Sequence, residues 1–288
     1  MTQAERRKYL ITALIKEQPQ YSNLVIPEDE QEEKYLLRSL FNIRMPQPVN
    51  QKFLEVQDAY LQEEIEQHGI TRIEDLQPIQ QGIYLWQGDI TTLQCDAIVN
   101  AANRQMLGCF CPNHGCIDNA IHTFAGVQLR LACAELMKEQ KHEETTGSAK
   151  ITPAFNLPCQ YVIHTVGPIV GDCLTKQDEM LLSSCYRSCL ELAEKNHIRH
   201  IAFCCISTGE FRFPNGRAAE IAIQTVKEYK AQTHSRMEVI FNVFKEADYN
   251  IYRKLLQTNY QTEKRDRKCR RYCDWSRGGN VCFGGIFL

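Results

Sequence analysis

The sequence lacks the long apolar runs and glycine-rich fingerprints that would assign it at once. No apolar stretch reaches 18 residues, which argues against a membrane-spanning helix. The opening segment, MTQAERRKYLITALIKEQ, has charges on both sides of a short apolar patch and predicts an amphipathic helix rather than a signal peptide. A cytoplasmic protein is therefore expected. Neither GxxxxGK[ST] nor a GxGxxG in the first strand–helix turn is present, which disfavours P-loop and standard dinucleotide sites.

Excess charge of one sign is missing too. The 33 lysines and arginines nearly balance the 35 acidic residues, for a net charge of −2. Such a balance gives no general attraction to nucleic acid or to an anionic membrane, so neither is an expected partner. Cysteine, by contrast, is abundant, with 14 in 288 residues. In a chain of this length without a secretion signal, metal binding or buried free thiols are expected rather than a disulfide framework.

The sequence divides into three regions with different residue patterns. Residues 1–75 predict a helical N-terminal extension, with one helix after a Thr2–Glu5 capping box and others over 28–41 and 51–68. Residues 76–258 alternate short β-rich runs with helical patterns over 118–138, 178–196, 217–230 and 247–257. This alternation indicates an α/β sandwich around a largely parallel sheet, with ligand sites in loops beyond the carboxyl ends of the strands. Residues 259–288 form a basic tail rich in cysteine and glycine.

The segment VNAANRQMLGCFCPNHGCIDNAIH, residues 99–122, carries the densest chemistry. Cys109, His114 and Cys116 bring two thiolates and one imidazole within eight positions, a donor set that suits Zn²⁺. Three protein ligands leave a coordination place for water or substrate. Cys111 is the candidate for a fourth ligand, which would make the zinc structural instead. A loop that binds no metal is the remaining alternative.

Polar residues around this segment have two interpretations each. Asp118 can stabilise the start of a helix through its favourable interaction with the helix dipole. Alternatively, its carboxylate can support a metal ligand or contact a bound ribose. His122, one turn later, is expected to be structural. Asn100 and Asn103 follow a predicted strand, where an amide can cap the next turn or bind sugar hydroxyls.

Two further strand ends carry candidate binding groups. The segment ISTGEFRFPNGRAAE, residues 206–220, follows a strand, and its backbone N–H groups at Ser207, Thr208 and Gly209 can cradle a diphosphate. In WQGDIT, residues 86–91, Asp89 is either a turn-forming residue after Gly88 or an acceptor for an adenine amino group.

Together these segments resemble the macrodomain family. The matching pieces are GDIT, DAIVNAAN, DNAIH, TGSAKITPAFNLPCQYVIHTVGP and ISTGEFRFP, in this order over roughly residues 80–258. Most macrodomains have glycines where this chain has CFCPNHGC. The form GCFxPxHxCIDNxIH resembles the zinc-dependent branch, many of whose members lie in microbial operons with a sirtuin and a lipoylated carrier protein. Members of that branch also carry a helical N-terminal extension.

The resemblance implies a three-layer α/β/α sandwich with a mixed, largely parallel sheet over residues 76–258. It also implies a role for each matched residue: Asp89 and Ile90 at the adenine; Asn242 and Phe244 flanking the adenine; Ser207, Thr208, Gly209, Glu210 and Phe211 around the diphosphate; Asn103 at the distal ribose; and Cys109, His114 and Cys116 on Zn²⁺. The implied reaction removes mono-ADP-ribose from protein side chains, with acidic side chains as the expected sites. Asn103 and Asp118, with a zinc-bound water, are then the catalytic groups.

The implied partners are ADP-ribose, a mono-ADP-ribosylated protein, and a lipoylated carrier protein with its sirtuin. Two other functions stay open at this stage: an ADP-ribose reader without turnover, and a deacetylase of O-acetyl-ADP-ribose. The chain departs from the family pattern in two places. Cys111 occupies a variable position of the motif and adds a competing thiolate, and the tail over 259–288 has no expected counterpart.

Overall fold

A computed structural model describes residues 1–258 of the chain, so the predicted tail over 259–288 lies outside the described residues. The N-terminal part forms three α-helices in the places that the apolar spacing predicted. Helix α1 spans Gln3–Lys16 and begins with the predicted capping box, in which Thr2 and Glu5 exchange backbone-to-side-chain hydrogen bonds. Helix α2 spans Glu30–Ile43, and α3 spans Gln51–His68, where Gly69 follows with a φ of 88°.

The strands form a mixed sheet that confirms the predicted α/β class. Within the described residues, seven strands lie in the order β2-β3-β9-β8-β5-β7-β6. The inner five pair in parallel, and the two edge strands, β2 and β6, pair antiparallel. Their bounds are β2 Pro78–Gln80, β3 Ile83–Gln87, β5 Ala97–Ala102, β6 Ala149–Pro153, β7 Tyr161–Val166, β8 His200–Phe203 and β9 Glu238–Val243. A separate parallel pair joins β1, Thr71–Arg72, to β4, Leu93–Gln94.

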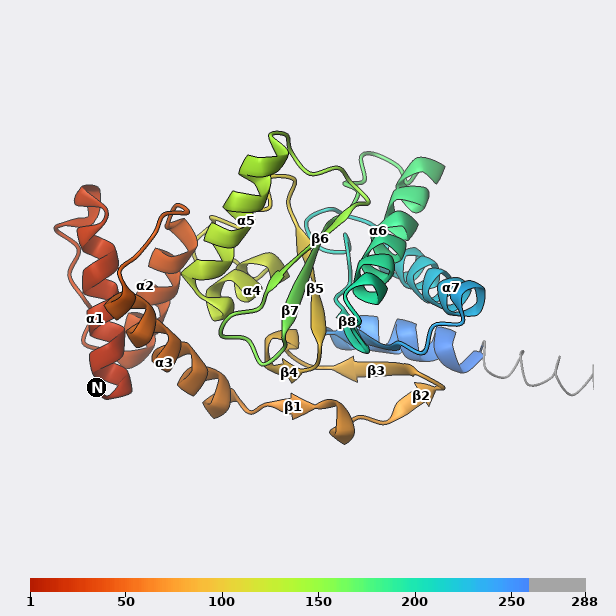
Figure 1. The fold of residues 1–288 in the computed structure, drawn as a ribbon, viewed down its shortest axis with the longest axis horizontal. Helices are drawn as coiled ribbons and strands as arrows, with labels where there is room; N and C mark the ends of the chain where they lie inside the picture. Colours follow the sequence, from red (N-terminus) through yellow and green to blue (C-terminus); the bar gives the residue numbers. More distant parts are fainter. Residues whose placement is uncertain (259–288) are drawn as a thin grey trace, which may run out of the picture.

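Helices cover both faces of this sheet. Figure 1 shows α4 and α5 on one side of the central strands and α6 and α7 on the other. Helix α4 spans Ile117–Ala125, α5 Val127–Gln140, α6 Lys176–Lys195 and α7 Asn215–Thr233, and a last helix covers residues 246–258. Short 3₁₀ helices lie at Pro19–Tyr21, Ile73–Asp75 and Ile90–Thr92.

One predicted helix is two helices in the structure. The pattern over 118–138 predicted a single helix, but Gly126 divides it into α4 and α5. Gly126 has a φ of 92°, outside the right-handed helical region. A Cβ at this position would lie 2.6 Å from Nε2 of Gln57 in α3, so the break is where the N-terminal extension packs against the sandwich.

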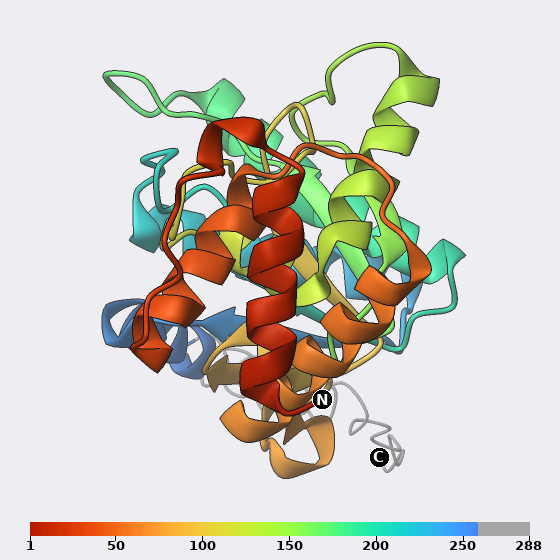
Figure 2. The same cartoon turned by 90° about the vertical axis from the view of Figure 1, so that its left-hand side faces the viewer.

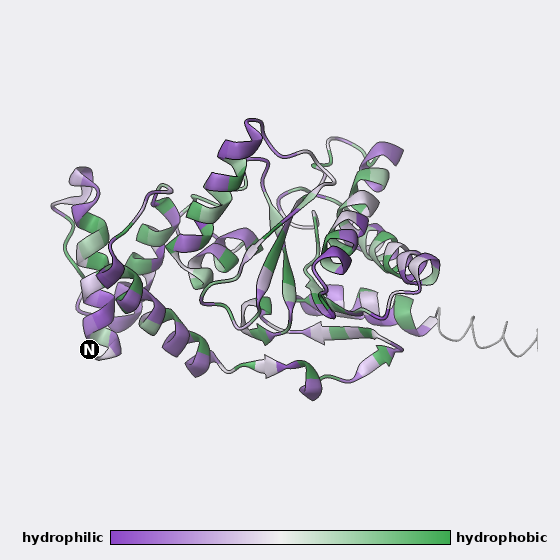
Figure 3. Ribbon diagram, in the orientation of Figure 1, coloured by the Kyte–Doolittle hydropathy of each residue, from purple (hydrophilic) through white to green (hydrophobic). Residues whose placement is uncertain are grey.

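The extension and the sandwich each contain an apolar cluster. The larger one surrounds the sheet, and in Figure 3 the strands show green apolar stretches interrupted by paler and purple residues. The smaller one lies between α1, α2 and α3 and includes Val127 of α5. Figure 2 views the molecule from this end, with α1 nearest the reader. Within residues 1–258, no helix is both long enough and apolar enough to span a membrane.

The parallel strands decide where a site can form. Because β3, β9, β8, β5 and β7 all run in one direction, the loops that follow them emerge at the same edge of the sheet. The residues singled out from the sequence lie in these loops: Asp89 after β3, Asn242 and Phe244 at the end of β9, Ser207 to Phe211 after β8, and Asn103 to Cys116 after β5.

Candidate functional site

The β5–α4 loop, residues 103–116, brings the three predicted metal donors together. The donor atoms of Cys109, His114 and Cys116 all lie within 4.8 Å of one another, and Nδ1 of His114 is 3.6 Å from Sγ of Cys109. All three side chains are partly exposed, so an ion can reach them from solvent. Cys111 lies outside this group and is exposed. The donor set therefore fits a zinc ion with three protein ligands.

Besides being a metal-donor candidate, Cys116 is the N-cap residue of α4. Its Sγ accepts a hydrogen bond from the backbone N–H of Asn119 at 3.4 Å. Burial raises the pKa of the Cys116 thiol to about 12, although this hydrogen bond acts in the opposite direction. A thiol in such a place becomes a thiolate readily only when a strong positive charge lies beside it, which a bound metal ion supplies.

Asp118 lies in the first turn of α4 and is buried. Its Oδ1 accepts a hydrogen bond from Nδ2 of Asn100 at 2.8 Å, and its Oδ2 is 3.5 Å from Nδ2 of Asn103. Burial raises the pKa of Asp118 to about 6, and the hydrogen bond from Asn100 partly opposes this. The carboxylate is thus fixed by the carboxyl end of β5 rather than turned to solvent as a simple helix-capping charge would be.

Asn103 also shapes the loop itself. Its Nδ2 donates to the carbonyl oxygen of Gly108 at 3.0 Å, and its Oδ1 accepts from the backbone of Gln105 at 3.1 Å. Both interpretations of this residue thus remain available, since its amide closes the turn and at the same time lies beside Asp118. A Cβ on Gly108 would lie 2.7 Å from the ring of His122, so glycine is required where the loop passes over α4.

A second set of possible metal donors lies deeper in the sandwich. Donor atoms of His122, Cys133 and His164 are also within 4.8 Å of one another, but all three residues are buried. Both ring nitrogens of His164 already have partners, Asn100 Nδ2 at 3.1 Å and Thr152 Oγ1 at 2.9 Å. Burial lowers the pKa of His164 to about 3, so its ring is neutral. We interpret this set as a buried polar network that supports Asn100, not as a metal site.

The β8–α7 loop, residues 204–214, forms the neighbouring part of the edge. Ser207 adopts a φ of 66°, and its carbonyl oxygen accepts from the backbone of Phe213 at 2.9 Å, which closes the loop. Within residues 1–258, the backbone N–H groups of Gly209, Glu210 and Phe211 donate to no acceptor. Three successive free N–H groups in one turn are a suitable cradle for an anion.

Glu210 connects this loop to the metal donors. Its Oε1 lies 3.6 Å from Nε2 of His114, and its side chain is exposed. Gly167, just after β7, approaches the loop from the other side, because a Cβ there would lie 2.0 Å from Oγ of Ser207. Neither contact was predicted from the sequence. The Gly-Pro pair at 167–168, directly after a strand, is a turn signal that could have drawn attention to Gly167.

The predicted adenine residues divide into two groups. Asp89 is half-buried, and both hydrogen bonds from Thr91 go to its Oδ1, so Oδ2 has no donor within residues 1–258. Phe244 is 74% exposed directly after β9. Ile90 is buried in the core, and the amide of Asn242 donates to the backbone oxygen of Gly88 at 2.9 Å. Ile90 and Asn242 thus build the edge, while Asp89 and Phe244 face outward from it.

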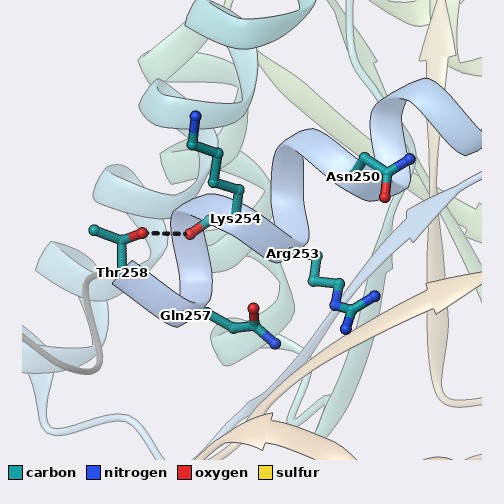
Figure 4. A pocket seen from close by; sticks show the side chains of 5 residues that line it. All are labelled: Asn250, Arg253, Lys254, Gln257 and Thr258. Atoms are coloured by element: carbon teal, nitrogen blue, oxygen red, sulfur yellow. Dashed lines mark hydrogen bonds between the residues drawn. The ribbon is translucent and has the colours of Figure 1, made fainter.

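A hollow elsewhere on the molecule has none of these metal donors. It is lined by Asn250, Arg253, Lys254, Gln257 and Thr258, the polar side of the last helix (Figure 4). The end of this helix is fixed by Gln80, whose Nε2 donates to the Leu256 carbonyl oxygen at 2.6 Å, near the start of β3. The hollow therefore lies toward the opposite edge of the sheet from the loops described above.

Comparison with known proteins agrees with this geometry. The Macro domain model matches residues 99–222. A protein-ADP-ribose hydrolase of Treponema medium is 59% identical over 260 residues, which cover 89% of this chain and all of the relative. A protein-ADP-ribose hydrolase of Staphylococcus aureus is 49% identical over 250 residues, covering 86% of this chain and 94% of the relative.

Solved structures give the same result for the fold. The crystal structure of a Trypanosoma brucei macrodomain in complex with ADP-ribose superposes with a TM-score of 0.60 at 30% sequence identity. The superposition covers 76% of this chain and 94% of the Trypanosoma brucei chain. The sheet order, the loops at its carboxyl edge and the close sequence relatives lead to one assignment: this chain belongs to the macrodomain family.

Proposed function

We propose that this protein is a zinc-dependent hydrolase that removes mono-ADP-ribose from acidic side chains of proteins. One observation carries the proposal: the three metal donors, the buried carboxylate of Asp118 and the free N–H groups at 209–211 meet at one edge of the sheet. The contact between His114 and Glu210 joins the donor loop directly to the anion cradle. A reader that only binds ADP-ribose has no need for the metal donors.

The side chains at this edge provide complementary contacts along an ADP-ribose molecule. Oδ2 of Asp89 is available to accept from the adenine amino group, and the exposed ring of Phe244 can cover the base. The N–H groups of Gly209, Glu210 and Phe211 are available for the diphosphate. The distal ribose then lies toward the β5–α4 loop, where Oδ1 of Asn103 accepts one bond from Gln105 and has a second lone pair for a ribose hydroxyl.

The chemistry at the distal ribose is the exchange of one bond for another. The bond between the anomeric carbon and the carboxyl oxygen of the modified side chain breaks, and a water oxygen bonds to that carbon. The products are free ADP-ribose and the restored carboxylic acid. A zinc ion held by Cys109, His114 and Cys116 would supply a positive charge that polarises an oxygen at this position.

Asp118 and Asn103 hold the reacting groups in place. Asn100 donates to Oδ1 of Asp118 at 2.8 Å, whereas Asn103 approaches Oδ2 only at 3.5 Å, so Oδ2 is the more available atom to accept a proton or a ribose hydroxyl. The fixed position of this carboxylate removes the need to order it during the reaction. Cys111 is outside the donor group, so a metal ion held by Cys109, His114 and Cys116 would have no fourth protein ligand from Cys111.

The test is release of ADP-ribose from a glutamate-linked, mono-ADP-ribosylated peptide by zinc-loaded protein. We expect release by the wild type, and loss of release after Cys116→Ala or stringent chelation. Cys111→Ala is the matched control on the same loop and should keep both zinc and activity. Release that survives Cys116→Ala and chelation would overturn the zinc mechanism. Binding of ADP-ribose without release from any linkage would identify a reader instead.

The linkage and the modified protein are separate parts of the proposal. Peptides modified on serine or arginine should be poor substrates beside the glutamate-linked one, and equal rates would contradict the acidic preference. The family resemblance makes a lipoylated carrier protein, modified by a partner sirtuin, the first substrate to assay. That partner remains a prediction.

A further inference from the structure

Helix α2 of the N-terminal extension lies directly against the metal donors. The guanidinium of Arg38 donates to the carbonyl oxygen of His114 at 3.1 Å and to Oδ1 of Asn119 at 2.9 and 3.2 Å. Asn119 in turn donates from Nδ2 to the carbonyl oxygen of Cys111 at 3.0 Å, and its backbone N–H bonds Sγ of Cys116. Arg38 therefore contacts the donor loop directly at His114 and, through Asn119, at Cys111 and Cys116.

Asn42, one turn further along α2, fixes the turn before His114. Its Oδ1 accepts from the backbone N–H of Asn113 at 2.9 Å, and its Nδ2 donates to Oγ1 of Thr123 at 3.0 Å. Asn113 has a φ of 54°, a left-handed conformation that costs free energy and needs support from its surroundings. Its own Nδ2 donates to Oγ of Ser39 at 2.7 Å and to the carbonyl oxygen of Tyr35 at 3.3 Å, so three hydrogen bonds join α2 to this strained residue.

Arg130 of α5 connects the start of the donor segment to the end of α2. Its Nε donates to the carbonyl oxygen of Leu107 at 2.7 Å, and its Nη1 donates to that of Phe41 at 3.0 Å and to that of Arg44. The same guanidinium lies 4.3 Å from the ring centre of Phe110. Arg130 is buried, so these bonds are not in competition with bulk water.

These contacts answer a physical problem of the β5–α4 loop. The loop has no regular secondary structure, so ordering its backbone costs conformational entropy. Metal donors on such a loop bind tightly only if that ordering has already taken place. The bonds from α2 and Asn119 hold the loop in the arrangement that brings the three donors together.

We propose that helix α2 is part of the metal site, and that metal binding and docking of the N-terminal extension stabilise each other. Arg38 and Asn42 are the positioning residues. The inference rests on the metal-binding part of the proposed function and deepens it. Coupling of this kind is reciprocal. The free energy by which docking of α2 strengthens metal binding equals the free energy by which bound metal strengthens docking of α2.

The first experiment measures zinc affinity by competition with a chelator, and the cobalt–thiolate absorption band of Co²⁺-loaded protein. Arg38→Met keeps the aliphatic stem but removes every donor, and Asn42→Leu removes both of its hydrogen bonds. We expect each to weaken zinc binding by about 10- to 100-fold, the range for groups that orient metal ligands. Arg38→Lys keeps the charge without the paired geometry and should fall between Arg38→Met and the wild type.

Lys34→Met is the matched control. Lys34 lies on the same helix and pairs with Glu30 and Glu64, away from the loop. It should leave zinc affinity unchanged. Wild-type affinity in Arg38→Met and Asn42→Leu, with all variants folded by circular dichroism, would overturn the inference while the zinc mechanism stands. A wild type that binds neither Zn²⁺ nor Co²⁺ at this loop would overturn the zinc mechanism and, with it, the inference.

The second experiment tests reciprocity by hydrogen exchange. Zinc should slow amide exchange in α2, around residues 35–43, in the wild type but not in Cys116→Ala. Without metal, Arg38→Met should speed exchange over residues 109–116, a readout that needs no zinc at all. Equal exchange in α2 with and without zinc, in a wild type shown to bind the ion, would contradict the coupling.

Discussion

The carboxylate of Glu210 lies 3.6 Å from Nε2 of His114, while Nδ1 of the same ring lies 3.6 Å from Sγ of Cys109. A histidine that binds a metal through Nδ1 donates its other N–H to a carboxylate in many metal sites, and this fixes the ring and increases its basicity. Glu210 thus has a position from which it can orient His114, although it comes from a different loop.

From this relationship we expect Glu210→Gln to weaken zinc affinity by about tenfold, at the lower end of the range for such groups, because Glu210 is exposed and its pairing is screened by solvent. Chelator competition measures the change. Glu143→Gln, which removes an exposed carboxylate paired with Arg104, should have no effect. Unchanged zinc affinity in Glu210→Gln would show that the contact does not orient the ring.

Asp118 should be required for turnover but not for binding. Asp118→Asn keeps the shape of the side chain and removes the charge, and groups that take or give protons in a transition state contribute about 10²- to 10⁴-fold to the rate. We expect the hydrolysis rate to fall by at least about 10²-fold, with the affinity for ADP-ribose within about threefold of wild type. Single-turnover kinetics and calorimetry separate the two quantities. Asp75→Asn, in the short 3₁₀ helix before β2, is the control and should be fully active.

The buried histidine network should make the fold sensitive to acid. An unfolded histidine titrates near pH 6.5, whereas burial lowers the pKa of His164 to about 3 in the folded protein. As the pH falls from 6.5 toward 3, the unfolded state binds a proton that the folded state does not. The free energy of unfolding therefore falls, by up to about 1.4 kcal/mol per pH unit for one such group.

Two neighbours of His164 modify this slope. Burial also lowers the pKa of His122, which adds to the loss of stability at low pH. Burial raises the pKa of Asp118 to about 6, so the folded state takes up a proton there first, and this offsets one histidine between about pH 6 and 4. The contribution of His164 is therefore best measured as a difference between proteins.

His164→Gln removes the titrating ring and should show a shallower dependence of unfolding free energy on pH than the wild type, by up to about 1.4 kcal/mol per unit. Urea denaturation between pH 4 and 7, with chelator present, gives both curves. Replacement of the exposed His142 by Gln should leave the slope as it is in the wild type. Parallel curves for His164→Gln and wild type would mean that His164 titrates normally in the folded state.

Local signals were sufficient to predict the helices of the extension. Thr2 and Glu5 formed the predicted capping box, and Gly69 ends α3 where the pattern placed it. The break at Gly126 was missed because its cause is not local. The sequence around Gly126 continues a helical pattern, and the close approach of Gln57, 69 positions earlier by their numbers, is visible only in the fold.

The parts of the site that lie at strand ends or in recognisable motifs could be predicted from the sequence. Alternation of strands and helices placed Asp89, Asn103 and the β8–α7 loop at one edge, and the spacing of Cys109, His114 and Cys116 predicted that these donors come together on the loop after β5. The contacts that hold this loop were not predictable. Arg38 and Asn119 are 81 residues apart, and nothing in the polar face of α2 distinguishes an arginine that binds a loop from one that is solvated.

The close approach of Gly167 to Ser207 gives the last prediction. A Cβ on Gly167 would lie 2.0 Å from Oγ of Ser207 and 2.9 Å from Cγ2 of Ile206, so Gly167→Ala must displace the β8–α7 loop. Ser207 already has a left-handed φ of 66°, which leaves it little freedom to move without a change in the N–H groups that follow. Overpacking of this kind costs about 1–3 kcal/mol, so we expect ADP-ribose binding to weaken by about tenfold, with a lower melting temperature.

Gly171→Ala is the control for this prediction. It lies four positions further along the same loop, and a Cβ there would meet no atom within 4 Å. Its affinity for ADP-ribose and its melting temperature should therefore match those of the wild type. If folded Gly167→Ala binds ADP-ribose as tightly as Gly171→Ala, the diphosphate cannot depend on the N–H groups of residues 209–211 in the arrangement that Ser207 sets. The anion would then have to be held elsewhere along the edge.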